Sequence, residues 1–87
     1  MAAYRLLIKR SAAKELEAVE PLKNRRRIVS RIASLSNDPR PDGCEKLAGF
    51  EDRFRLRQGS WRIIYAVDDD VRTVEIVKIG HRREVYR

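Results

Sequence analysis

The chain has 87 residues, of which 43% are hydrophobic and 38% charged, and this composition predicts one folded domain spanning residues 1–87. Its longest apolar runs are far shorter than the roughly 20 residues that cross a bilayer, and residues 2–8 are too short for a signal peptide, so we expect no membrane partner. The single cysteine excludes an internal disulfide and no group of Cys and His has metal-ligand spacing, which favours a cytoplasmic protein without metal or cofactor.

The first third of the chain predicts a strand followed by a helix. Residues from Tyr4 to Lys9 form a short apolar run bounded by charge, which is typical of a strand. Ser11 is a predicted N-cap, because its hydroxyl can accept from the amides of the first turn. The apolar residues that fall on one face of this helix are Ala12, Leu16 and Val19. Pro21 ends this helix or opens the next, since proline is tolerated in a first turn.

A second amphipathic helix is predicted from Leu22 to Leu35, with most of its arginines on the solvent side. The run Asn37-Asp38-Pro39 ends it. Residues 39–49 hold two prolines and two glycines and predict a loop. Leu47 and Phe50 are expected to anchor that loop to the core.

Three strands are predicted in the second half of the chain. The segment from Arg53 to Arg57 meets Trp61 to Val67 across a tight turn, and Val71 to Ile79 follows an acidic turn. These strands form an antiparallel meander. The fold class is therefore α+β, with element order β-α-α-β-β-β and a helical hairpin packed on one face of an antiparallel sheet.

Arginines occupy alternate positions of the first of these strands. Successive side chains of a strand point to opposite faces, so Arg53, Arg55 and Arg57 line one face while Phe54 and Leu56 enter the core. Arg62 follows across the turn. A net charge of +7 draws the chain to acidic partners, and we interpret the row as a site for RNA. The alternative is a solvated sheet face without a ligand.

The last residues, GHRREVYR, bring the only histidine and a tyrosine. His81 and Tyr86 are the two side chains there with titration useful for catalysis. The structural alternatives are that His81 caps the last strand or pairs with Glu84, and that the ring of Tyr86 packs over the sheet. Trp61 and Tyr65 share a strand face and could stack on bases, but core packing is favoured because apolar residues share that face.

Residues 54–65, FRLRQGSWRIIY, and residues 80–86, GHRREVY, resemble the RelE/ParE superfamily of bacterial toxins, and more closely its RelE branch. The resemblance covers essentially the whole chain. It implies a RelE-like fold and a toxin of a type II toxin–antitoxin pair that cleaves mRNA in the ribosomal A site. It also implies a cognate antitoxin as partner, with operator DNA contacted only indirectly through the antitoxin complex.

The resemblance also assigns residues, position by position. The two sheet lysines of well-known members fall at Arg53 and Arg55, and the arginine after the hairpin falls at Arg62. The C-terminal arginine falls at Arg82, or at Arg83 because one residue is missing before the terminal tyrosine, which falls at Tyr86. Both lysines are arginines here, which remain protonated at physiological pH and cannot act as a general base.

RNA cleavage by its own 2′-hydroxyl needs a base, a proton for the leaving oxygen and stabilisation of the gathering charge. Arginine meets the third need, because its planar fork offers paired donors to phosphate. In our scheme Tyr86 acts as the base, and Arg82 or His81 assists or protonates the leaving group. Arg55 and Arg62 clamp the phosphate. The RNA backbone would be bound by Arg53, Arg57 and Arg83. The alternatives are a ParE-like inhibitor of DNA gyrase without nuclease activity, and a degenerate relative that binds antitoxin or RNA without cutting.

Overall fold

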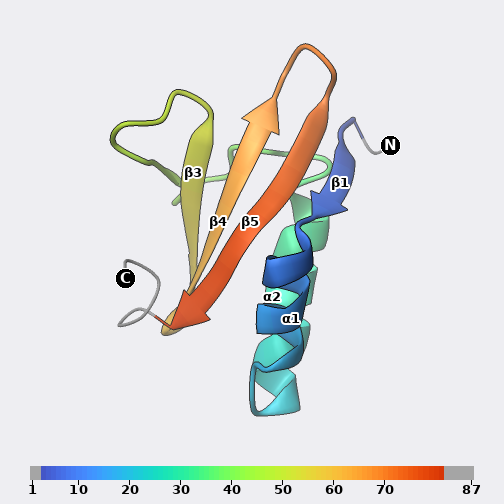
Figure 1. The fold of residues 1–87 in the computed structure, drawn as a ribbon, viewed down its shortest axis with the longest axis vertical. Coiled ribbons are helices and arrows are strands. Elements are labelled where there is room, and N and C mark those ends of the chain that lie inside the picture. Colours follow the sequence, from blue (N-terminus) through green and yellow to red (C-terminus); the bar gives the residue numbers. More distant parts are fainter. Residues whose placement is uncertain (1–2, 82–87) are drawn as a thin grey trace.

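The structure, a computed structural model, describes residues 3–81. In chain order the elements are β1 (Arg5–Ile8), α1 (Arg10–Glu17), α2 (Leu22–Ser34), β2 (Glu45–Lys46), β3 (Arg53–Gln58), β4 (Trp61–Asp68) and β5 (Thr73–His81). Figure 1 shows the two helices on the same side of the long strands, with α1 following directly from β1. Neither helix of residues 3–81 has the length and apolar character needed to span a membrane.

The five strands form one sheet in the order β1-β5-β4-β3-β2. The predicted antiparallel meander of β3, β4 and β5 is confirmed, and so is the α+β class. One detail differs, because β1 pairs with β5 in parallel and the sheet is therefore mixed. Parallel pairing needs a long connection between the two strands, and here all the other elements lie between them.

The loop predicted for residues 39–49 contains the short strand β2, which pairs antiparallel with β3. This strand was missed because two charged residues show no periodicity and have low intrinsic strand preference. Phe50, expected to anchor the loop to the core, is 46% exposed instead. Its ring lies under the guanidinium of Arg53, which gives it a partner outside the core.

Helix α1 begins two residues earlier than the predicted N-cap Ser11 implies, at Arg10 in place of Ala12. The N-cap is Lys9, which makes no side-chain capping bond, and the carbonyl of Lys9 accepts from the amide of Ala13 at 2.9 Å. Ser11 therefore lies inside the first turn and is not the cap. Helix α2 starts at Leu22 directly after Pro21, as predicted from the tolerance of proline at a helix start.

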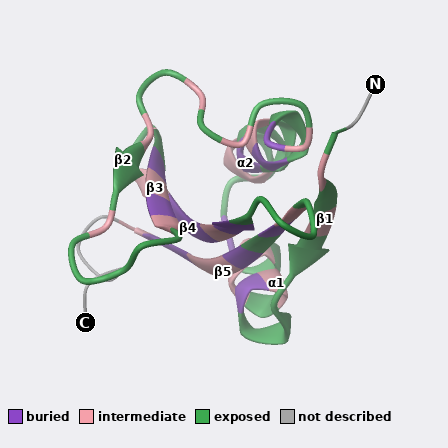
Figure 2. Cartoon of the chain, turned by 90° about the horizontal axis from the view of Figure 1, so that it is seen from above, coloured by how far each residue is buried: buried purple, intermediate pink, exposed green. Residues whose placement is uncertain are grey.

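One face of the sheet forms the core together with both helices. Cross-strand partners Phe54, Tyr65 and Ile76 make one row across it, and Leu56, Ile63 and Ile79 make the next. Figure 2 shows the buried positions along these strands and on the sides of the helices that face them. Among the described residues the core cluster is Ala12, Val19, Ile28, Ile32, Leu35, Phe54, Leu56, Ile63, Tyr65, Val67, Val74, Ile76 and Ile79.

Core packing is confirmed as the main role of the aromatic residues on β4. Tyr65 is fully buried, and Trp61 packs against the edge of the cluster while keeping part of its surface accessible. The hydroxyl of Tyr65 donates to the carbonyl of Pro39 at 2.8 Å, which satisfies its one polar group. Burial also raises the pKa of Tyr65 far above its ordinary value. This tyrosine is therefore structural.

Candidate functional site

The arginines of β3 and β4 lie together on the sheet face opposite the core, which we call the arginine face. It is defined by Arg53, Arg55, Arg57 and Arg62. The burial of β3 alternates as predicted, with Phe54 and Leu56 inward. Arg57 and Arg62 are direct cross-strand partners, so their Cβ atoms are close neighbours. Residues separated along the chain by a turn thus contribute to one basic surface.

Glu45 of β2 crosses this surface and bridges two of its arginines. One carboxylate oxygen accepts a short hydrogen bond from Arg55, and the other lies 3.7 Å from Nη2 of Arg57. Arg55 is the more buried partner, with 18% of its side chain exposed. The Glu45 side chain is half exposed, so an anion from solvent can approach the same arginines. Sequence reasoning missed Glu45 because it assigned that segment to a loop.

Arg62 is held against the turn between β3 and β4. Its Nη1 donates to the carbonyl of Gly59 at 3.1 Å and to that of Trp61 at 3.0 Å. Gly59 has a positive φ of 62°, a conformation that glycine adopts without strain. A guanidinium carries five N–H donors in a rigid planar fork, and the two bonds from Nη1 fix the orientation of that fork. The turn therefore pre-positions one cation of the face.

An apolar groove borders the arginine face at Arg53. It has a volume of about 440 Å³ and is lined by Leu47, Ala48, Phe50, Arg53, Ile64, Val77 and Lys78. The Arg53 guanidinium lies 4.6 Å from the centroid of the Phe50 ring, which is a favourable cation–π geometry. Arg53 therefore lies at the boundary between charge and apolar surface, a placement that the alternating pattern alone did not indicate.

His81 ends β5 on the side that faces the helices. It is paired in register with Trp61, and their rings meet edge to face with centroids 5.7 Å apart. Arg62 is paired with Gly80, the residue before it, and projects to the other face. The structure therefore brings His81 to the same end of the sheet as Arg62, but on the opposite surface.

Three predicted site residues, Arg82, Arg83 and Tyr86, lie outside the described residues. Strand β5 ends at His81, which is paired with Trp61 at the start of β4. Among residues 3–81, no group of three or more His, Cys, Asp or Glu side chains could hold a metal ion.

Among exposed groups of the described residues, the shifted pKa values belong to one cluster, which lies at the end of β4 away from Arg62. Its members are Tyr4, Arg40 and Asp69. Asp69 accepts from the Tyr4 hydroxyl at 2.6 Å and from both terminal nitrogens of Arg40. The hydrogen bonds from Arg40 and Tyr4 lower the pKa of Asp69, and the bond to Asp69 raises the pKa of Tyr4. This cluster ties the N-terminal segment to the turn between β4 and β5, at the end of β4 opposite to Arg62.

Fold and surface together define a small basic α+β domain with a cationic sheet face. The family model described as ParE toxin of the type II toxin–antitoxin system parDE matches residues 6–86. The chain therefore belongs to the RelE/ParE superfamily of type II toxin–antitoxin toxins.

Individual relatives agree with this membership. The chain is 32% identical to the toxin RelE of Mycobacterium tuberculosis over 85 residues, which are 97% of this chain and 87% of that toxin. It is also 32% identical to the toxin RelG of the same organism over 56 residues, which are 64% of each chain and thus less than two thirds of RelG. An archaeal RelE–RelB complex from Pyrococcus horikoshii has the same fold, with a TM-score of 0.82 at 28% identity, covering 95% of this chain and 99% of that one.

Proposed function

We propose that the protein is a ribosome-dependent mRNA endonuclease that cuts its substrate in the A site and so inhibits translation. The observation that carries the proposal is the register of β3 and β4, which gathers Arg55, Arg57 and Arg62 on one sheet face. Guanidinium groups bind phosphate oxygens through paired donors, so this surface suits an RNA backbone. Similarity to the toxins RelE and RelG of M. tuberculosis supports the same class.

In the proposed reaction the 2′-oxygen attacks the adjacent phosphorus and the bond to the 5′-oxygen breaks. The products are a 2′,3′-cyclic phosphate and a 5′-hydroxyl. Tyr86 as the phenolate takes the proton of the 2′-hydroxyl, while Arg55 and Arg62 bind the phosphate oxygens and stabilise the added charge. Arg82 donates a hydrogen bond to the leaving 5′-oxygen, which takes up a proton from water.

We assign the leaving-group role to Arg82 in preference to His81, since His81 shares the helix-facing side with Trp61. Arg53, Arg57 and Arg83 contact the flanking backbone in this scheme. In this scheme the RNA backbone displaces the Glu45 carboxylate from Arg55 and Arg57. Each of these contacts is electrostatic and independent of base sequence.

Dependence on the ribosome follows from the weakness of the proton-transfer groups. Neither arginine nor an ordinary phenol is an efficient base near neutral pH. Orientation of the mRNA by the ribosome supplies what the side chains lack, since favourable positioning can lower a barrier by about 7–11 kcal/mol. Free RNA should therefore be a poor substrate.

The proposed regulatory partner is a cognate antitoxin with an acidic, amphipathic segment. The structural relative from P. horikoshii is a RelE–RelB complex, and the net charge of +7 on this domain favours an acidic partner. The apolar groove beside Arg53 suits the nonpolar side of such a segment. Operator DNA would be contacted only through the antitoxin in this complex.

A second candidate, inhibition of DNA gyrase, is favoured by the description of the matching family model as a ParE toxin. The two functions are separated by adding the purified protein to a translation reaction on a defined mRNA and, separately, to a gyrase supercoiling assay. Codon-phased breaks seen by primer extension, with 2′,3′-cyclic phosphate ends, support the nuclease. Loss of supercoiling without mRNA breaks supports the gyrase inhibitor, and neither effect indicates a relative that binds without cutting.

A further inference from the structure

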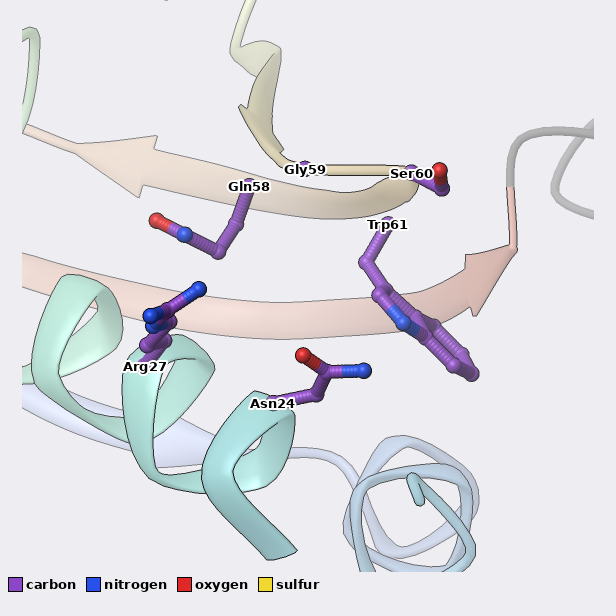
Figure 3. A pocket seen from close by; sticks show the side chains of 6 residues that line it. All are labelled: Asn24, Arg27, Gln58, Gly59, Ser60 and Trp61. Carbon is purple, nitrogen blue, oxygen red and sulfur yellow. The ribbon is translucent and has the colours of Figure 1, made fainter. Parts of the chain in front are cut away.

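A polar pocket lies at the tip of the hairpin formed by β3 and β4, between the hairpin and the start of α2. It has a volume of about 170 Å³ and is lined by Asn24, Arg27, Gln58, Gly59, Ser60 and Trp61. Figure 3 shows Gln58 extending from the hairpin toward Arg27 on α2, with the Trp61 ring and Asn24 on the other side of the space. Segments more than thirty positions apart in the sequence thus enclose it.

The size of the pocket limits what it can hold. Sites for complete small-molecule ligands usually measure about 300–1,000 Å³, so this pocket suits a single planar ring system. Its wall provides an indole, which is held in place by edge-to-face contact with His81. Aromatic side chains of this kind are the usual stacking partners of unpaired bases.

The polar groups of the pocket are suited to a base edge and less so to a phosphate. Two of the side chains are amides, Asn24 and Gln58, and an amide carries both donors and an acceptor. One N–H of Asn24 already donates to the carbonyl of Glu20 at 3.3 Å, which orients this amide at the start of α2. Arg27 is the only cation among the lining residues. A phosphate site would require several donors and no acceptors, whereas the edges of nucleobases present both kinds of group.

The pocket and the arginine face meet at the turn between β3 and β4, from opposite sides of the sheet. Gly59 lines the pocket, and its carbonyl accepts the hydrogen bond from Nη1 of Arg62 at 3.1 Å. Gln58 and Trp61 are the last cross-strand pair before the turn, and Arg57 and Arg62 are the next pair on the other face. An RNA strand whose phosphate lies on Arg57 and Arg62 can therefore pass a neighbouring base around the turn into the pocket.

We propose that this pocket binds one unstacked base of a single-stranded RNA and that Asn24 and Gln58 select which base enters. The inference rests on the proposed function for its biological substrate, and it would make the hairpin tip a determinant of codon preference. Trp61 forms the stacking wall, and Arg27 binds the phosphate or sugar attached to that base.

The first test needs no ribosome, because Trp61 is the only tryptophan and its fluorescence reports on this pocket. The probes are the four ribonucleoside 5′-monophosphates and ribose 5-phosphate, which lacks a base. We expect saturable quenching by at least one nucleotide, with different affinities among the four bases, and none by ribose 5-phosphate. Equal quenching by all five compounds, or none by any, would overturn the proposal.

Variants of the lining residues test whether the fluorescence quenching comes from binding in this pocket. Gln58→Ala and Asn24→Ala should weaken binding of the preferred nucleotide about fivefold or more, the usual effect of losing one base-edge contact. Asn37→Ala, an exposed amide at the other end of α2, is the matched control and should change nothing. Gln58→Glu and Asn24→Asp serve as the second pair of variants if the alanine variants fold poorly. They keep side-chain size and replace donors by acceptors, so they should change the order of affinities among the four nucleotides. Unchanged affinities in all four folded variants would contradict the inference.

A second measurement separates this inference from the proposed function. Sequencing of mRNA ends after translation with wild type and Gln58→Glu should show cleavage in both proteins at different codons. Cleavage at the same codons with unchanged rate would refute the base pocket while leaving the nuclease intact. Absence of cleavage by wild type, with base-selective quenching retained, would refute the nuclease and leave the pocket as a nucleotide site.

Discussion

Glu45 and Arg55 are direct partners across β2 and β3, and their side chains also form an ion pair on the arginine face. The backbone register therefore places a carboxylate over the cations that are proposed to bind phosphate. Because half of the Glu45 side chain is exposed, solvent screens the pair and its net stabilisation is small. Glu45 is thus placed where it would compete with an anionic ligand for these arginines.

The Glu45→Gln variant should bind single-stranded RNA more tightly than wild type. Removal of the carboxylate removes a competing anion from Arg55 and Arg57. Each added phosphate contact on a single strand steepens the plot of log K against log salt by about 0.7. Titration of a labelled oligonucleotide at several salt concentrations measures both effects. Glu51→Gln, at an exposed position of the next loop, is the control. An identical slope in wild type and Glu45→Gln would show that the carboxylate does not compete with RNA.

Replacement of Arg62 should impair cleavage even when charge is kept. Removing one preorganised donor to a developing oxyanion typically costs about 100–1,000-fold in kcat, and we expect this loss for Arg62→Ala. Arg62→Lys should recover only part of it, because an ammonium cannot hold both turn carbonyls and a phosphate in a planar fork. Single-turnover cleavage of mRNA on ribosomes gives the rate, with exposed Arg10→Lys as control. Full activity of Arg62→Lys would contradict the clamp.

Tyr86→Phe tests the proposed general base. Loss of only the ionisable hydroxyl should lower the cleavage rate about 100-fold to 10,000-fold, the range typical of general acid–base groups. Affinity for RNA should stay the same, because the arginines supply it. The two quantities are measured by single-turnover kinetics and by oligonucleotide titration. A variant that cleaves at the wild-type rate would remove Tyr86 from the mechanism.

The cluster around Asp69 predicts a pH dependence of stability. Hydrogen bonds from Arg40 and Tyr4 hold the pKa of Asp69 in the folded protein below its ordinary value of 3.8. The stabilisation of the fold by the Asp69 carboxylate is therefore complete above the pKa of the unfolded chain. That contribution is lost as the pH falls through the folded pKa. Urea unfolding from pH 7 to pH 2 should therefore show a smaller acid-induced loss for Asp69→Asn than for wild type. Asp42→Asn, another exposed aspartate, should follow wild type, and parallel curves for all three proteins would refute the assignment.

Local patterns in the sequence predict much of this fold. The alternation of arginine with Phe54 and Leu56 identifies β3 and both of its faces, because side-chain direction in a strand follows directly from position. Leu22 follows Pro21 at a helix start for a similarly local reason. The arginine face was predictable because all four of its residues belong to one hairpin.

Long-range relationships were not predictable from such patterns. The pairing of β1 with β5 joins residues almost seventy positions apart, and no local signal specifies it. The contact of Glu45 with Arg55 depends on a strand of only two residues. The orientation of His81 depends on a register shift between β4 and β5 near Ile64, which a strict period of two does not anticipate.

The parallel pairing of β1 and β5 also constrains how the protein is made. Arg5 leaves the ribosome early, yet its partner Thr73 is synthesised late, so the sheet cannot close during most of translation. In the finished chain, the loop-closure entropy of such a distant contact also slows its formation. Chains interrupted before β5 lack the strand that joins β1 to β4, and with it one strand of each core row. Premature termination should therefore yield unfolded fragments that cellular proteases remove.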